Sequence, residues 1–119
     1  MNVVDSSGWL EYFADTPRAK LFAPAIDAPV KLVVPVISIY EVFKRVLRDL
    51  GEDKALQIVS VMMNGKVVEI DTPLVLEAAH LKMPLADSII YATTLRHEAT
   101  LWTQDEDFKG LPSVRYFAK

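Results

Sequence analysis

Short β-branched apolar runs alternate with helix-like segments along the whole chain, and this alternation limits the possible folds more than any other feature. The runs are bounded by turn residues, which is typical of buried strands. They cover residues 2–4, 31–34, 67–70, 100–102 and 113–117. Strands that alternate with helices form parallel sheets with right-handed crossovers. The sequence therefore predicts an α/β fold, a parallel sheet of about five strands flanked by helices.

The segments between the runs carry helix signals. Caps, prolines and apolar spacing predict helices that begin after Ser6 or Ser7, at Pro17, at Ser38, at Glu52, at Pro73 and at Leu85. The helix from Glu52 is expected to bury Leu56, Val59 and Met63. The helix over residues 85–98 is apolar nearly all round, so we expect it to be among the most buried.

Length and composition restrict the class of protein. Residues 1–119 are enough for one domain, and 51% apolar with 24% charged residues is typical of a globular chain. The absence of cysteine excludes disulfides and thiolate metal sites. The net charge of −3 argues against a broad phosphate-binding surface, although a local metal ion can supply positive charge. No signal peptide and no apolar run of about 20 residues is found, so we expect a cytoplasmic protein without membrane contact.

Four acidic residues fall at matching junctions. Asp5 and Asp105 follow the first and fourth predicted strands, and Glu41 and Asp87 lie near helix N-termini. In a parallel sheet these positions share the C-terminal edge of the strands, where ligands bind. Two carboxylates about 4 Å apart repel by about 4 kcal/mol at an effective dielectric constant near 20, so the group needs protons or a cation. Oxygen ligands favour Mg²⁺ or Mn²⁺, which suits phosphodiester hydrolysis by a metal-activated water.

Each carboxylate also has a local explanation. Asp5 can cap the first helix, and Ser38 with Glu41 matches a capping box. Asp87 in the first turn offsets the helix macrodipole, and Asp105 is an ordinary turn residue. The sequence alone leaves both explanations open at each position.

Several segments together resemble a known family. Val3–Ser7, Glu41 after the second strand, residues 84–92 (PLADSIIYA) and residues 103–108 (TQDEDF) look like the PIN-domain ribonucleases, and most closely like the VapC-type toxins of toxin–antitoxin pairs. The resemblance spans essentially the whole chain. It departs from the family pattern between Pro73 and Pro84, where this sequence is several residues shorter; either the connection is short, which tightens one side of the site, or residues are missing from the sequence.

The resemblance implies a function and a set of site residues. It implies a three-layer fold and an Mg²⁺- or Mn²⁺-dependent endoribonuclease that cuts RNA, acts as a homodimer and is inhibited by a cognate antitoxin protein. The implied catalytic and metal-binding residues are Asp5, Glu41, Asp87 and Asp105, with Thr103, Ser7 and Asp107 as auxiliary groups.

Other interpretations fit parts of the same sequence. A non-catalytic PIN-like interaction module remains the alternative function. A phosphotransfer enzyme with Asp5 as the phosphorylated group is disfavoured, because Ser7 stands where a dehalogenase-like phosphatase needs a second aspartate. Lys44, Arg45 and Arg48 fit either RNA phosphates or a solvated helix face.

Overall fold

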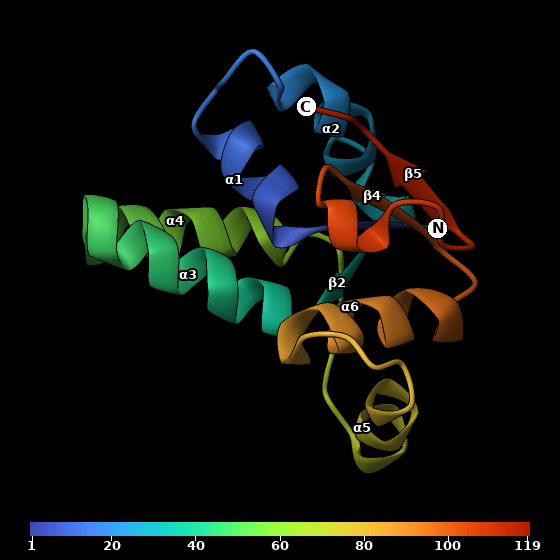
Figure 1. Ribbon diagram of the computed structural model, residues 1–119. Coiled ribbons are helices and arrows are strands. Elements are labelled where there is room, and N and C mark those ends of the chain that lie inside the picture. Colours follow the sequence, from blue (N-terminus) through green and yellow to red (C-terminus); the bar gives the residue numbers. More distant parts are fainter.

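Five short parallel strands form the centre of the molecule, which a computed structural model describes over residues 1–119 (Figure 1). The strands are β1 (Asn2–Val4), β2 (Val33–Pro35), β3 (Lys66–Val68), β4 (Thr100–Thr103) and β5 (Val114–Tyr116). β1 pairs with β4, β4 with β5, and β2 with β3, all in parallel register. The predicted alternation of strands and helices is therefore confirmed.

The strands form two hydrogen-bonded groups rather than one continuous sheet. One group has the order β1-β4-β5 and the other pairs β2 with β3, and a single bridge between Asn2 and Leu32 joins them. Residues Pro29–Lys31 form a 3-10 helix (η1), so β2 starts later than the sequence suggested and overlaps β1 only at its beginning. The spatial order β3-β2-β1-β4-β5 reverses direction between β1 and β4, which makes their C-terminal ends a topological switch point.

Six α-helices surround the strands (Figure 1). They are α1 (Ser6–Phe13), α2 (Ala19–Ile26), α3 (Val36–Leu50), α4 (Glu52–Met62), α5 (Thr72–Ala79) and α6 (Leu85–Arg96), with a second 3-10 helix η2 (Glu106–Phe108) after β4. α3 and α4 lie side by side as a pair that extends away from the sheet, and α5 lies outside α6. None of these helices is long and apolar enough to cross a bilayer.

Alternate side chains of each strand enter two separate cores. Val4, Val34 and Trp102 pack with side chains from α1 to α4. Their neighbours in sequence, Val3, Val33 and Leu101, pack in a second core, which includes Ile90 and Tyr91 of α6. Successive strand residues point to opposite faces of a sheet, so α1–α4 cover one face and α6 the other. This is the three-layer arrangement that the sequence predicted.

Glycine allows α1 to approach the sheet closely. A Cβ atom at Gly8 would lie 2.6 Å from the ring of Phe22 and 2.8 Å from Val4. No side chain fits at that separation, so Gly8 sets the distance between α1 and β1. The first turn of α1 is thereby held against the C-terminal end of β1.

Several predicted helix boundaries are wrong. Asp5, rather than Ser6 or Ser7, is the N-cap of α1, because its side chain reaches the Ser6 amide. α2 begins at Ala19 rather than Pro17 and contains Pro24 within its length.

The predicted start of α3 and the predicted face of α4 are also wrong. α3 begins at Val36, directly after Pro35, so Ser38 lies inside the first turn and does not form a capping box with Glu41. The buried residues of α4 are Ala55, Ile58 and Met62, whereas Leu56 and Met63 are exposed. α4 carries apolar residues on two adjacent sides. The side that packs against α3 is formed by residues that each lie one position before the predicted ones.

Candidate metal centre

Asp5 lies at the switch point and is held from three directions. Its side chain is 4% exposed. One carboxylate oxygen accepts a 2.8 Å hydrogen bond from the Ser6 amide, as a helix cap does. The other accepts a 2.9 Å bond from the Thr103 hydroxyl and a longer, 3.4 Å bond from the Ser7 hydroxyl. The cap interpretation of Asp5 is therefore correct, and it does not exclude a role in ligand binding.

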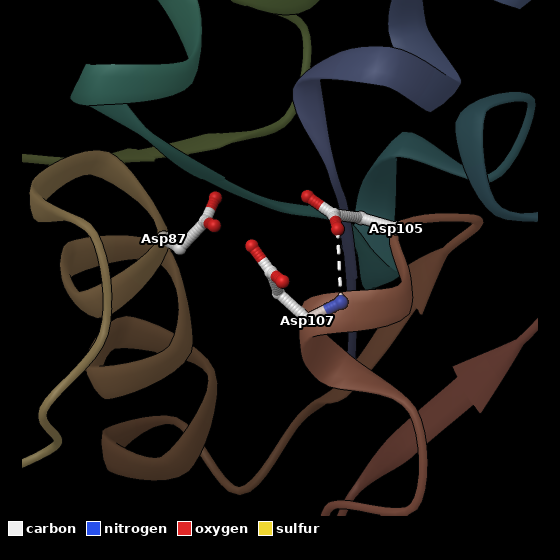
Figure 2. A group of neighbouring side chains, drawn as sticks. All are labelled: Asp87, Asp105 and Asp107. Carbon is white, nitrogen blue, oxygen red and sulfur yellow. Dashed lines mark hydrogen bonds between the residues drawn. The ribbon is translucent and has the colours of Figure 1, made fainter.

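Thr103 connects the ends of β1 and β4. While its Oγ1 donates to Asp5, the same atom accepts a 2.9 Å hydrogen bond from the Asp105 amide. The Asp105 carboxylate in turn accepts a 2.9 Å bond from the Asp107 amide and so starts η2 (Figure 2). This chain of bonds fixes Asp105 and Asp107 relative to Asp5.

Asp87 approaches the same place from α6. It lies in the first turn of that helix, whose N-terminus reaches the C-terminal edge of the strands. Figure 2 shows its carboxylate directed toward those of Asp105 and Asp107. One carboxylate oxygen from each of these three residues lies within 4.8 Å of the others. Such a spacing allows one cation to contact all three.

Glu41 is positioned by a residue that the sequence analysis did not select. The Ser6 hydroxyl, at the start of α1, donates a 2.6 Å hydrogen bond to Glu41 Oε1 in the second turn of α3. No local signal points to this contact, because 35 positions separate the two residues. The auxiliary candidate Ser7 makes only the longer contact with Asp5.

Asp5 and Glu41 lie near the three aspartates of Figure 2, and the five side chains are here called the acidic cluster (Asp5, Glu41, Asp87, Asp105 and Asp107). Burial raises the pKa of Asp5 to about 6. The hydrogen bonds from Thr103 and Ser6 lower this pKa, and the nearby charges of Asp105 and Glu41 raise it further. The pKa of Asp87 is raised to about 7 by burial and by the other four carboxylates. Of the four residues expected from the sequence, Asp87 and Asp105 belong to the group with 4.8 Å spacing, together with Asp107, whereas Asp5 and Glu41 lie beside that group and are not part of it.

The acidic cluster has the properties of a site for a hard cation. Its donors are all carboxylate oxygens, the ligands that Mg²⁺ and Mn²⁺ prefer. Burial is the main cause of the raised pKa values of Asp5 and Asp87, and repulsion from the neighbouring carboxylates adds to it, so a cation would favour the ionised forms of both. A surface hollow of about 450 Å³ borders the cluster, lined by Ser7, Gln104, Asp105, Glu106, Asp107, Tyr116 and Lys119. The site is thus open to a large substrate on one side.

Comparison with known proteins identifies the fold. The model of the PIN domain family matches residues 3–113. A search among curated proteins finds no match. Among solved structures, a toxin–antitoxin complex from Klebsiella pneumoniae aligns with a TM-score of 0.80 at 22% identity, over 97% of this chain and 96% of that chain.

Two further structures show the same likeness. VapC20 of Mycobacterium tuberculosis, a toxin that cleaves the sarcin–ricin loop, aligns with a TM-score of 0.75 at 19% identity, over 97% of this chain and 99% of that one. FitAcB of Neisseria gonorrhoeae aligns with a TM-score of 0.73 at 19% identity, over 99% of this chain and 97% of that one. At these identities the structures establish the fold, and the family match covers nearly the whole sequence. The chain therefore belongs to the PIN domain family.

Proposed function

We propose that this chain is a divalent-metal-dependent endoribonuclease that acts as the toxin of a toxin–antitoxin pair. The observation that carries the proposal is the acidic cluster, in which oxygens of Asp87, Asp105 and Asp107 lie within 4.8 Å of one another at the open edge of the sheet. A group of acids with raised pKa values that lies beside a surface hollow is typical of a catalytic site. The match to the PIN domain family supports a nuclease.

Mg²⁺ or Mn²⁺ would be held by Asp87 and Asp105 together with Asp107, whose oxygens are close enough to share one ion, and by Asp5 and Glu41 next to them. When bound, such an ion polarises the phosphoryl oxygen and lowers the pKa of a coordinated water. The protein's own residues perform the other tasks. Thr103 keeps Asp5 and Asp105 in fixed relative positions, and Ser6 holds the Glu41 carboxylate. No side chain of the cluster is required to form a covalent bond with the substrate.

Asp87 and Asp107 would have different tasks. The carboxyl of Asp87, whose pKa is raised to about 7 mainly by burial, would have to lose its proton to act as a metal ligand. Asp107 is more exposed and lines the surface hollow, so it would be the first of these carboxylates that an arriving phosphodiester meets.

The proposal includes partners and location. The structural relatives include toxin–antitoxin complexes, which supports an antitoxin protein as the inhibitor of this chain. We further propose that residues 1–119 act as one domain, that the chain forms a homodimer, and that it works in the cytoplasm on RNA. The two cores on opposite faces of the same strands support the single domain.

The test is cleavage of a mixed pool of single-stranded RNA by the purified protein. We expect cutting with Mg²⁺ or Mn²⁺ and none with EDTA. Asp5→Asn removes a ligand charge while leaving the helix cap, and should slow cleavage by about 10³-fold or more. The matched control is Asp53→Asn, an exposed change in the first turn of α4 that should cleave like the parent.

Two results would contradict the proposal. Cleavage by Asp5→Asn at the parent rate would show that the acidic cluster is not the catalytic site. Absence of metal-dependent cleavage from the parent, together with a melting temperature that Mn²⁺ does not change, would favour the non-catalytic interaction module.

A further inference from the structure

A row of exposed side chains runs along α3 away from the acidic cluster. Tyr40, Lys44 and Arg48 recur at every fourth residue, so they lie on one side of the helix, about 6 Å apart along its axis. With Glu41 and Arg45 they line a surface hollow of about 450 Å³. Glu41 accepts the hydrogen bond from Ser6, the residue next to Asp5, so one end of the hollow adjoins the acidic cluster and the rest follows α3.

The charge of this row is opposite to that of the protein. The chain carries a net charge of −3, yet three of its thirteen Lys and Arg residues occur within five positions of α3. Arg45 and Arg48 both contact Asp49, at 2.8 and 2.9 Å. Lys44 forms no ion pair; its Nζ atom lies 3.5 Å from the Tyr40 hydroxyl. Two carboxylates, Asp49 and the Glu41 of the hollow, thus stand against three cations, which leaves an excess of one positive charge for an anion.

Tyr40 adds a second feature that points to nucleic acid. Its side chain is 58% exposed although it is aromatic. Lys44 Nζ lies 5.6 Å from the centre of its ring, a cation–π geometry that orients both groups. Exposed aromatic rings beside cations are the elements with which proteins bind single-stranded nucleic acids, by base stacking and phosphate contact.

A bound cation would attract only the phosphodiester that is cut, and the acidic cluster offers no contact for the phosphates on either side of it. The α3 row is a set of cations that shares a hollow with Glu41 and could contact those phosphates. We propose that Tyr40, Lys44 and Arg48 form a binding track for single-stranded RNA, in which the two cations contact successive phosphates and Tyr40 stacks on a base. This assignment rests on the proposed ribonuclease function and names the substrate contacts of that site.

The first experiment removes the two cations. Lys44→Ala/Arg48→Ala should raise KM for a single-stranded RNA about tenfold and change kcat by less than about threefold, because the contacts act on binding rather than on the reacting atoms. The matched control is Lys20→Ala/Lys31→Ala, which removes the same charge from exposed positions outside α3 and should leave KM unchanged.

The second experiment measures binding without cleavage. In an Asp5→Asn background with EDTA, the affinity for labelled mixed-sequence RNA is followed by fluorescence anisotropy against salt concentration. Loss of two phosphate contacts should reduce the slope of log K against log salt by about 1.4, or about 0.7 for each cation. Tyr40→Ala should raise Kd about fivefold or more, and Tyr40→Phe should retain the parent affinity because the ring remains.

The outcomes separate this inference from the proposed function. A parent-like KM and salt slope for Lys44→Ala/Arg48→Ala would overturn the track while leaving the nuclease in place. The track would also be overturned if Lys44→Ala/Arg48→Ala bound poly-glutamate more weakly than the parent but bound RNA equally well. That result would assign the row to an acidic protein partner. RNA binding that depends on the row, without metal-dependent cleavage by the parent, would support the track and contradict the nuclease. No RNA binding at all would overturn both.

Discussion

The two sides of the acidic cluster are built differently. On the strand side, Asp5 and Asp105 are connected through the Thr103 hydroxyl and accept hydrogen bonds from backbone amides. On the helix side, hydrogen bonds play no part in the pKa of Asp87, which is raised by burial and by neighbouring charges alone. Its carboxylate faces Asp105 and Asp107 across the gap (Figure 2).

The difference shows how the site is assembled. The strand side is fixed by bonds that exist without a ligand, whereas Asp87 is placed only by the packing of α6. That packing is firm, because the next residues of the helix, Ser88 to Thr94, are buried. Asp87 is therefore held close to like charges without a hydrogen bond or an ion pair of its own, and a cation that bridges the two sides would remove this repulsion.

The largest expected effect comes from removing the charge on the helix side. Asp87→Asn should slow RNA cleavage by about 10³-fold. It should also increase the free energy of unfolding in EDTA at pH 8, because repulsion is lost and no hydrogen bond is broken. Urea unfolding measures the second effect.

Asp105→Asn provides the comparison from the strand side. It should slow cleavage as much as Asp87→Asn, but without the gain in stability, since Asp105 accepts the Asp107 amide and caps η2. A lower stability for Asp87→Asn than for the parent would show that the two sides do not differ as described.

The pH dependence of folding stability tests both sides of the acidic cluster without mutation, because Asp5 lies on the strand side and Asp87 on the helix side. The pKa of Asp5 rises from 3.8 to about 6 and that of Asp87 to about 7. An acid with a raised folded pKa binds its proton more tightly in the folded state, so stability is lost as pH rises from about 4 through 7. The metal-free protein should therefore become less stable across this interval.

The affinity for divalent ions should have the opposite pH dependence to the stability of the metal-free protein, and should increase as pH rises. Because ligands must be deprotonated, Mn²⁺ affinity should fall about 1,000-fold between pH 8 and pH 5, about 100-fold from protonation of Asp87 and about tenfold from that of Asp5. Calorimetric titration at the two pH values measures the change. The shift in melting temperature caused by Mn²⁺ should be larger at pH 8, and an equal shift at both values would contradict the assignment of these acids to the metal site.

The fold and the location of the site were predictable from the sequence because they depend on patterns that repeat. Val3 and Val4 face different cores, as strand alternation requires, and Asp5 and Asp105 directly follow strands that pair with each other. Strand order cannot be obtained from periodicity alone, but parallel connections bring all strand C-termini to one edge. The convergence of the acids follows from topology.

The contacts that fix the individual side chains were not predictable. The bond from Ser6 to Glu41 joins α1 to α3, and the capping-box pattern at Ser38 suggested a different role for Glu41. Ser38 is instead fully buried, and its hydroxyl has no partner in the protein. On α4, Leu56 and Met63 are apolar yet exposed, so apolar spacing did not distinguish the buried side. Such details depend on packing between distant segments.

Substitution of Thr103 should have a smaller effect and concerns the strand side of the acidic cluster alone. Thr103→Val keeps the shape but removes the hydroxyl that connects Asp5 and Asp105. We expect Mn²⁺ affinity and cleavage to fall about 10–100-fold, the usual effect of losing a group that orients metal ligands. Thr103→Ser is the matched control and should restore most of both. Equal loss in the serine variant would indicate that packing of the methyl group, rather than the hydroxyl, is what matters.

Substitutions of Ser6 and Ser7 should have the smallest effects on Mn²⁺ affinity, and they show which of the two hydroxyls supports the metal site. Family resemblance pointed to Ser7, whereas the geometry favours Ser6, whose 2.6 Å bond to Glu41 is much shorter than the 3.4 Å contact of Ser7 with Asp5. Ser6→Ala frees the Glu41 carboxylate while leaving the amide that binds Asp5. Mn²⁺ affinity should then fall by about tenfold, because a hydrogen bond to a charged group contributes about 1.5 kcal/mol. Ser7→Ala should change it by less than about twofold. Calorimetric titration of the two variants compares them directly, and a larger loss in Ser7→Ala would mean that the hydroxyl next to Asp5 contributes more than the one that holds Glu41.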